Sequence, residues 1–92
     1  MRYVYQHIDS PNAAKLNGDG KVLQLLLTPV SNEALVDISL IGNGNEYFIA
    51  KNVTLILGTP LDVFEKEYNY DPTYQFVVRV LSGSVDMLLT VS

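Results

Sequence analysis

Apolar and polar residues alternate with a period of two along much of the chain. In residues 36–40, three aliphatic side chains fall on one side, and an aspartate and a serine fall on the other. Successive side chains of a β-strand point to opposite faces, so this alternation predicts a strand with one buried face. The same pattern predicts two strands near the C-terminus, over residues 74–80 and 85–91. We therefore expect a chain built from half-buried strands.

Strands are also predicted over residues 2–8 and 21–27, and weaker ones over residues 46–52 and 61–66. In the second of these segments, Leu23, Leu25 and Leu27 are expected to share the apolar face. Helix signals are poor. Residues 13–16, which follow Ser10-Pro11, could form one helical turn but are too short for a lone helix.

Residues that favour turns separate the predicted strands, at residues 17–20, 31–33, 42–45, 58–60, 69–72 and 82–84. Asn-Gly and Asp-Gly pairs favour tight turns, so Asn17-Gly18-Asp19-Gly20 is expected to be a hairpin turn rather than a calcium loop. Short strands at even spacing are typical of a sandwich or barrel. We predict an all-β protein, a small antiparallel β-sandwich of jelly-roll or immunoglobulin-like type, with seven or eight strands in a single domain over residues 1–92.

Composition and charge narrow the possible functions. Ten acidic residues against six basic ones give a net charge of -4, which disfavours binding to nucleic acid because phosphates are neutralised by Lys and Arg. The absence of cysteine excludes disulfides, thiol catalysis and thiolate metal sites. His7 is the only histidine, so a catalytic triad or a zinc site would depend on one residue. We predict no enzymatic activity, no cofactor and no metal site.

No signal peptide and no membrane helix are expected. The first ten residues are polar at every second or third position, and apolar runs are far shorter than the roughly 20 residues of a membrane span. We expect synthesis in a cytoplasm and no contact with a membrane.

Tyrosines are the candidate contact residues. A tyrosine offers an apolar ring with a polar tip, and this combination is enriched at protein interfaces. The candidates are Tyr3, Tyr5, Tyr68, Tyr70 and Tyr74. Exposed aromatic rings also stack against sugars, so a carbohydrate-binding or receptor-binding module is an alternative.

A second apolar surface is expected on the nominally polar sides of the last two strands, where Val77, Leu81 and Leu88 occur. Such a surface would be covered by another copy or a partner. A chain of 92 residues buries a limited fraction of its surface, which also favours association. We expect a homo-oligomer, with a trimer as one option, and we expect residues 1–20 to contribute a strand and loop to contacts between subunits.

Four segments carry a resemblance to a known family: Val36–Leu40, Glu46–Leu55, Gly58–Val63 and Ser82–Met87. The first segment is a predicted strand, and the second, which follows an Asn/Gly-rich hairpin, is a strand with the pattern Tyr-x-Ile-Ala-Lys-Asn-Val. The third contains the pattern Gly-Thr-x-Leu-Asp, and the fourth is a final Gly-Ser hairpin. From Lys21 to Ser92 the chain resembles the small β-sandwich virion proteins of tailed bacteriophages.

The resemblance implies a structural role in the virion and transfers no active-site residues. The implied protein is a capsid decoration (cement) protein, or alternatively a neck or tail accessory protein. Its implied partners are other virion proteins, namely the major capsid protein or neck and tail proteins, and its implied location is the virion.

Overall fold

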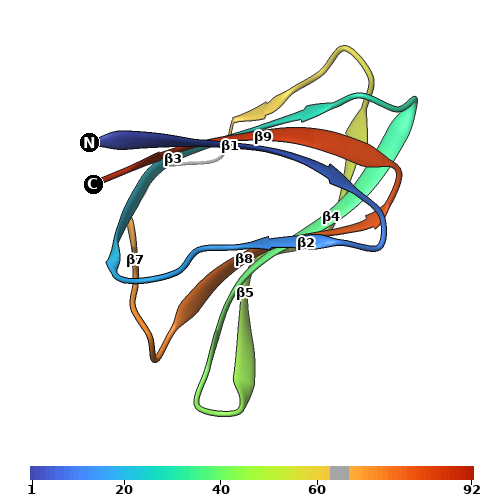
Figure 1. Cartoon of the computed structure of the whole chain (residues 1–92). Helices are drawn as coiled ribbons and strands as arrows, with labels where there is room; N and C mark the ends of the chain where they lie inside the picture. The colour runs from blue at the N-terminus through green and yellow to red at the C-terminus, as the bar shows by residue number, and fades with distance from the viewer. Residues whose placement is uncertain (63–66) are drawn as a thin grey trace.

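A computed structural model describes residues 1–62 and 67–92, and these form two packed antiparallel sheets (Figure 1). The first sheet contains β1 (Arg2–Asp9), β9 (Ser84–Val91), β3 (Gly20–Pro29), β6 (Leu61–Asp62) and β7 (Tyr68–Tyr70). The second contains β2 (Ala13–Lys15), β8 (Gln75–Ser82), β4 (Glu33–Gly42) and β5 (Asn45–Ile56). Strands β6 and β7 pair with the same side of β3, so each sheet is four strands wide. The predicted all-β sandwich is confirmed.

Figure 1 shows the two layers and their edges. Strands β1, β9 and β3 lie in one layer and β2, β8 and β4 in the other, and the two chain termini lie side by side. The β4–β5 hairpin projects beyond the sandwich at the bottom of the view. Because β1 leads directly to β2 and β5 leads to β6, strands β1 and β5 lie at opposite edges of the sandwich.

The core between the sheets is filled by the alternating aliphatic and aromatic residues. Its members from β4, β8 and β9 are Ala34, Val36, Ile38, Phe76, Val78, Val80, Val85, Met87, Leu89 and Val91. Burying one such side chain stabilises the fold by about 1.5–3 kcal/mol before entropy is counted. The predicted inward faces of these three strands are therefore confirmed.

Strand β3 departs from its predicted faces because it contains a β-bulge. Its pairing with β9 shifts between Val22 and Gln24, which makes Leu23 the extra residue. Val22, Leu25 and Leu27 are buried, whereas Leu23 is only half-buried. The prediction that Leu23 shares the face of the two later leucines is wrong, since an inserted residue reverses the alternation.

Two of the expected hairpin turns connect different sheets instead. Residues 17–20 join β2 to β3, and Gly83 joins β8 to β9, so neither turn closes a hairpin. Residues 42–45 do form the β4–β5 hairpin, with φ of 53° at Asn43 and 75° at Gly44. Two successive positive φ angles are what a two-residue hairpin loop of type I′ requires.

Two further expectations concern short segments. Residues 13–15 form the edge strand β2, not a helical turn, because pairing with β8 satisfies their backbone groups. The strand expected over residues 61–66 is present as β6 at residues 61–62, and its remainder lies outside the described residues.

Candidate functional site: an exposed sheet edge

The four edges of the sandwich differ in how easily another strand could pair with them. Strands β2, β6 and β7 have only two or three residues each. Strand β5 is long, but it has two register shifts against β4 and a positive φ of 54° at Asn52. Shortness and bulges both hinder pairing with a further strand. Among the described strands, β1 is the long regular edge, with eight residues in unbroken register with β9.

The backbone of β1 presents hydrogen-bonding groups outward at every second residue. The Ser10 amide donates to the Gly83 carbonyl at 3.0 Å, and bonded pairs recur at every second residue of an antiparallel ladder. Even-numbered residues of β1 therefore bond to β9, and the peptide groups of Tyr3, Tyr5 and His7 face outward. The Asp9 carbonyl also faces away from β9, and it accepts a hydrogen bond from the Asn12 amide at 2.9 Å.

Two tyrosine rings stand on the outer face of β1. Tyr3 is 57% exposed and Tyr5 is 73% exposed, and their ring centroids lie 6.4 Å apart. The inner residues of the same strand, Val4 and Ile8, pack into the core, so period-two alternation places the rings outside. These are two of the five tyrosine candidates, and the structure brings them together.

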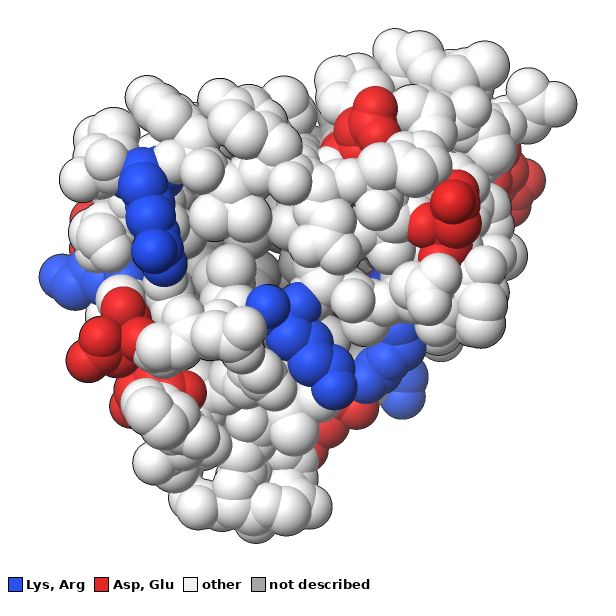
Figure 2. Space-filling view, in the orientation of Figure 1, with Lys and Arg blue, Asp and Glu red and all other residues white. Residues whose placement is uncertain are grey.

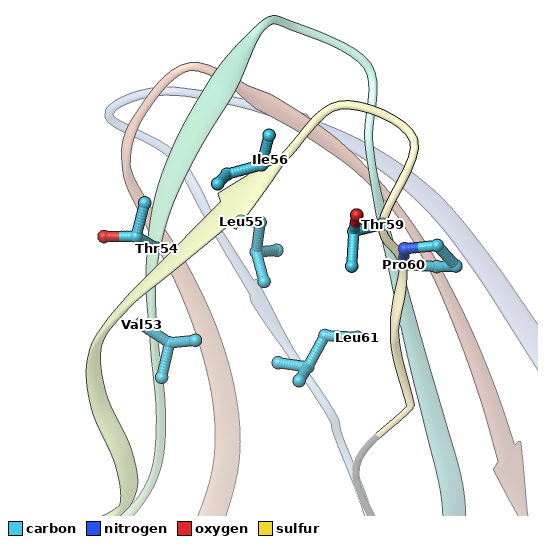
Figure 3. Close-up of a pocket in the computed structure, with 7 residues that line it drawn as sticks. All are labelled: Val53, Thr54, Leu55, Ile56, Thr59, Pro60 and Leu61. Atoms are coloured by element: carbon cyan, nitrogen blue, oxygen red, sulfur yellow. The ribbon is translucent and has the colours of Figure 1, made fainter.

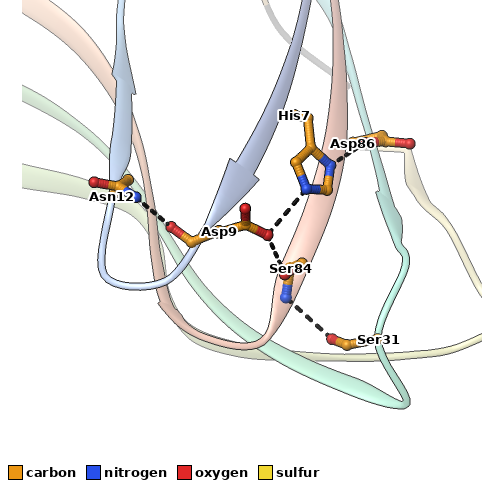
Figure 4. A network of polar contacts seen from close by, with 6 residues as sticks. All are labelled: His7, Asp9, Asn12, Ser31, Ser84 and Asp86. Atoms are coloured by element: carbon orange, nitrogen blue, oxygen red, sulfur yellow. Dashed lines mark hydrogen bonds and ion pairs between the residues drawn. The ribbon is translucent and has the colours of Figure 1, made fainter.

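His7 lies between two carboxylates at the end of β1 (Figure 4). Its Nδ1 atom is 2.6 Å from Oδ1 of Asp86, and its Nε2 atom is 2.9 Å from Oδ1 of Asp9. An ionised carboxylate only accepts hydrogen bonds, so both contacts are hydrogen bonds only when both ring nitrogens carry protons. The bonds to Asp86 and Asp9 accordingly raise the pKa of His7 above its ordinary value of 6.5.

Ser84 completes this cluster without forming a catalytic triad. Its hydroxyl donates to Oδ1 of Asp9 at 2.5 Å and thereby lowers the pKa of Asp9, while its amide donates to Oγ of Ser31 at 3.0 Å (Figure 4). A triad requires the serine hydroxyl to be bonded to the histidine. Here the serine bonds to the aspartate, and the side chains of His7, Asp9 and Asp86 are more than half exposed. The cluster is a solvated ion network that links β1 to β9.

The other three tyrosine candidates lie elsewhere. Tyr70 is only 2% exposed, so it is a core residue and its prediction as a contact residue is wrong. It pairs with Gly20 of β3, where a Cβ atom would lie 3.0 Å from the Tyr70 hydroxyl, so the glycine makes room for the ring. Tyr68 is half-buried against the core. Tyr74 is half-buried near the β4–β5 hairpin, and its hydroxyl accepts a hydrogen bond from Nδ2 of Asn43 at 2.7 Å.

The expected second apolar surface is not a single patch. Val77 is fully buried, at 0% exposure. Leu81 points outward from the second sheet and Leu88 outward from the first, because each alternates with core residues of its own strand. Those residues therefore lie on opposite sides of the sandwich, and that expectation is wrong.

A polar cluster on the outer side of the second sheet was missed by the sequence analysis. The Glu46 carboxylate accepts hydrogen bonds from the Ser39 hydroxyl at 2.7 Å and from Nη1 of Arg79 at 3.0 Å, and these contacts lower the pKa of Glu46. Asp37 is buried, and its Oδ1 atom accepts from the Asn52 amide at 2.7 Å. Asp37 thus holds the bulge of β5, which gives the cluster a structural role.

Two hollows open on the described part of the surface. One of about 170 Å³ is lined by Val53, Thr54, Leu55, Ile56, Thr59, Pro60 and Leu61 (Figure 3). The other, of about 330 Å³, is lined by Leu16, Asn17, Gly18, Ile41, Asp71, Pro72 and Gln75. Asp71 is the one titratable side chain among these lining residues, so neither hollow brings an acid and a base together.

The distribution of charge, the placement of metal-binding side chains and the lengths of helices were also compared with what nucleic-acid, metal and membrane binding require. On the face shown in Figure 2, charged side chains of both signs are scattered among broad uncharged areas, without a continuous basic patch. Within residues 1–62 and 67–92, no three His, Cys, Asp or Glu side chains are placed to hold a metal ion. The same residues contain no helix that could cross a membrane.

Comparison with models of protein families, with curated proteins and with solved structures found no match.

Proposed function

We propose that this chain is a non-enzymatic structural protein that binds other proteins of a larger assembly, and that the assembly is a bacteriophage particle which it stabilises as a capsid decoration protein. The observation that carries the proposal is the exposure of large apolar side chains at two opposite edges of the sandwich. Tyr3 and Tyr5 lie on β1, and Tyr47, Ile56 and Leu57 lie on β5 and directly after it.

Two separate edges with exposed apolar side chains suit a protein that binds neighbouring proteins on two sides. Single apolar side chains are common on protein surfaces, but neighbouring large ones, such as the pairs Tyr3 with Tyr5 and Ile56 with Leu57, are informative, and aromatic ones are enriched at interfaces. A small domain without disulfides gains stability from its neighbours when they cover such residues. The resemblance of Lys21–Ser92 to phage virion proteins supports the choice of a phage particle as the assembly.

The proposal is tested on particles purified by density gradient from the source that carries this gene. Quantitative mass spectrometry should find the protein at a copy number near that of the capsid lattice, and particles that lack it should release DNA at a lower temperature. A copy number near one ring per particle would replace the decoration role by a neck or tail role. Absence from particles would overturn the proposal.

Rebinding to particles that lack the protein tests the surface itself. A double variant, Ile56→Ser with Leu57→Ser, should weaken rebinding at least about tenfold, because it removes exposed apolar anchors. Leu81→Ser is the matched control, since Leu81 is also exposed but lies on the flat side of the second sheet. Equal rebinding of both variants would argue against the β5 edge as the contact.

A further inference from the structure

We propose that two copies of this chain pair through β1, so that their first sheets join into one continuous sheet across a two-fold axis at Tyr5. This inference rests on the proposed assembly function and identifies one neighbour as a second copy.

The outward peptide groups of β1 are self-complementary. Those of Tyr3, Tyr5 and His7 face away from β9 and are spaced symmetrically about Tyr5. A two-fold axis at Tyr5 places Tyr5 opposite the partner's Tyr5, and Tyr3 opposite the partner's His7. Each of the three bonded pairs exchanges two hydrogen bonds, which gives about six bonds between the chains. An antiparallel second copy therefore satisfies the outward backbone groups of Tyr3, Tyr5 and His7 with the same three residues of its own strand.

Side chains and charges also suit this register. Residues directly opposite each other lie on the same face, so the Tyr5 rings of the two copies meet on the outer face. The imidazole of His7, held between Asp9 and Asp86, faces the ring of the partner's Tyr3, and the protonated imidazole pairs favourably with an aromatic face. Asp9 lies four residues from the axis, so the two copies' Asp9 residues are roughly 26 Å apart and their repulsion is screened.

The size of the contact predicts a weak dimer. Tyr3 and Tyr5 are 57% and 73% exposed, and a tyrosine buries on the order of 200 Å². The two rings together then bury roughly 250 Å² per copy, well below the about 800 Å² of a standard interface. We expect dimers at high protein concentration and monomers after dilution.

Engineered cysteines test the register, because the natural chain has none. Tyr5→Cys should form a disulfide-linked dimer under mild oxidation, since bonded partners have Cα atoms about 5.5 Å apart, within disulfide range. Tyr3→Cys should not link to itself, because its two copies would be roughly 13 Å apart. A mixture of Tyr3→Cys and His7→Cys should link to each other. Leu81→Cys, at an exposed residue of β8 outside both proposed contact edges, measures chance collisions.

Sedimentation equilibrium tests the dimer without a cross-link. The mass of the natural chain should rise from 10.2 kDa toward twice that value as concentration increases. Tyr5→Pro should abolish the rise, since it removes an outward N–H and leaves the bonds to β9 in place. If circular dichroism shows that Tyr5→Pro does not fold, Tyr5→Ser is used instead. It removes the aromatic ring from the contact and should likewise abolish the rise in mass.

Two results would overturn the inference: a natural chain that stays monomeric at millimolar concentration, or Tyr3→Cys linking to itself as readily as Tyr5→Cys. A monomeric chain that still rebinds particles would refute this inference alone. A dimer that is absent from particles would refute the proposed function alone.

Discussion

Replacing Gly83 by alanine should destabilise the sandwich more than the same replacement at the other glycines with positive φ. Gly83 forms the corner where the chain passes from β8 in the second sheet to β9 in the first, with a φ of 75°. A Cβ atom there would lie 2.3 Å from the carbonyl oxygen of Glu33, 2.6 Å from Oγ of Ser31 and 3.0 Å from Cα of Ala34. Two of these three atoms belong to the backbone, so a side-chain rotation cannot relieve the contact.

Two costs add at this corner. An alanine with left-handed φ costs about 1–2 kcal/mol, and this cost is shared by Gly18, Gly44 and Gly58. Crowding of a packed site costs about 1–3 kcal/mol more, and it applies to Gly83 alone because the other three positions have no atom within 4 Å. We therefore expect about 2–5 kcal/mol for Gly83→Ala and about 1–2 kcal/mol for each control. The difference corresponds to a midpoint roughly 5–20 °C lower.

Urea unfolding followed by circular dichroism measures these free energies, with thermal unfolding as a second reading. The slope of free energy against urea should stay constant, which shows that the variants expose the same surface on unfolding. If Gly83→Ala loses no more stability than Gly44→Ala, to within about 0.5 kcal/mol, the backbone at Gly83 shifts to accommodate a Cβ atom at little cost. The prediction from the close contacts would then be wrong.

The remaining predictions concern the two polar clusters and the core. The pKa of His7 is raised in the folded state, so His7 stabilises the fold fully below its unfolded pKa and loses this contribution as the pH rises through its folded pKa. The natural chain should therefore melt at a higher temperature than His7→Gln at pH 6, and this difference should shrink toward pH 9. Melting temperatures of the two proteins that run parallel from pH 6 to pH 9 would contradict this. Asp37→Ala removes the buried carboxylate that accepts a hydrogen bond from the backbone N–H of Asn52, and a hydrogen bond to a charged group contributes about 1.5–3 kcal/mol. The substitution should therefore cost about 1–3 kcal/mol in urea unfolding, against less than about 0.5 kcal/mol for the exposed Asp19→Ala. Phe76→Ala should cost about 3–5 kcal/mol, and an equal loss in Phe48→Ala, a partly exposed position, would refute the assignment of the core.

Local alternation was sufficient to predict which residues of β4, β8 and β9 face the core. It failed at Leu23, because a bulge is set by pairing with β9 and leaves no mark in the neighbouring residues. The turn signals at residues 17–20 and at Gly83 marked where the chain bends, but not the sheet to which the next strand belongs. Those partners are decided by contacts between residues far apart in the chain.

The candidate site was predictable only in part. Tyr3, Tyr5, His7 and Asp9 alternate along one strand, so their common face follows from the sequence. Asp86 joins them because β9 pairs with β1, across a separation of 79 residues. Tyr70 shows the opposite case, since its ring is buried by the space that a distant glycine leaves.

The residue pattern by itself determined that this chain forms strands, that β4, β8 and β9 each bury one face, and that Tyr3, Tyr5 and His7 share one face of the first strand. Only the tertiary structure decided that β1 is a regular edge, that β5 is bent by bulges, and that His7 lies between two carboxylates. The physical reason is the distance along the chain over which each feature is determined. A strand's own alternation follows from backbone geometry within a few residues, whereas edges and side-chain clusters depend on which distant strands pair and in which register.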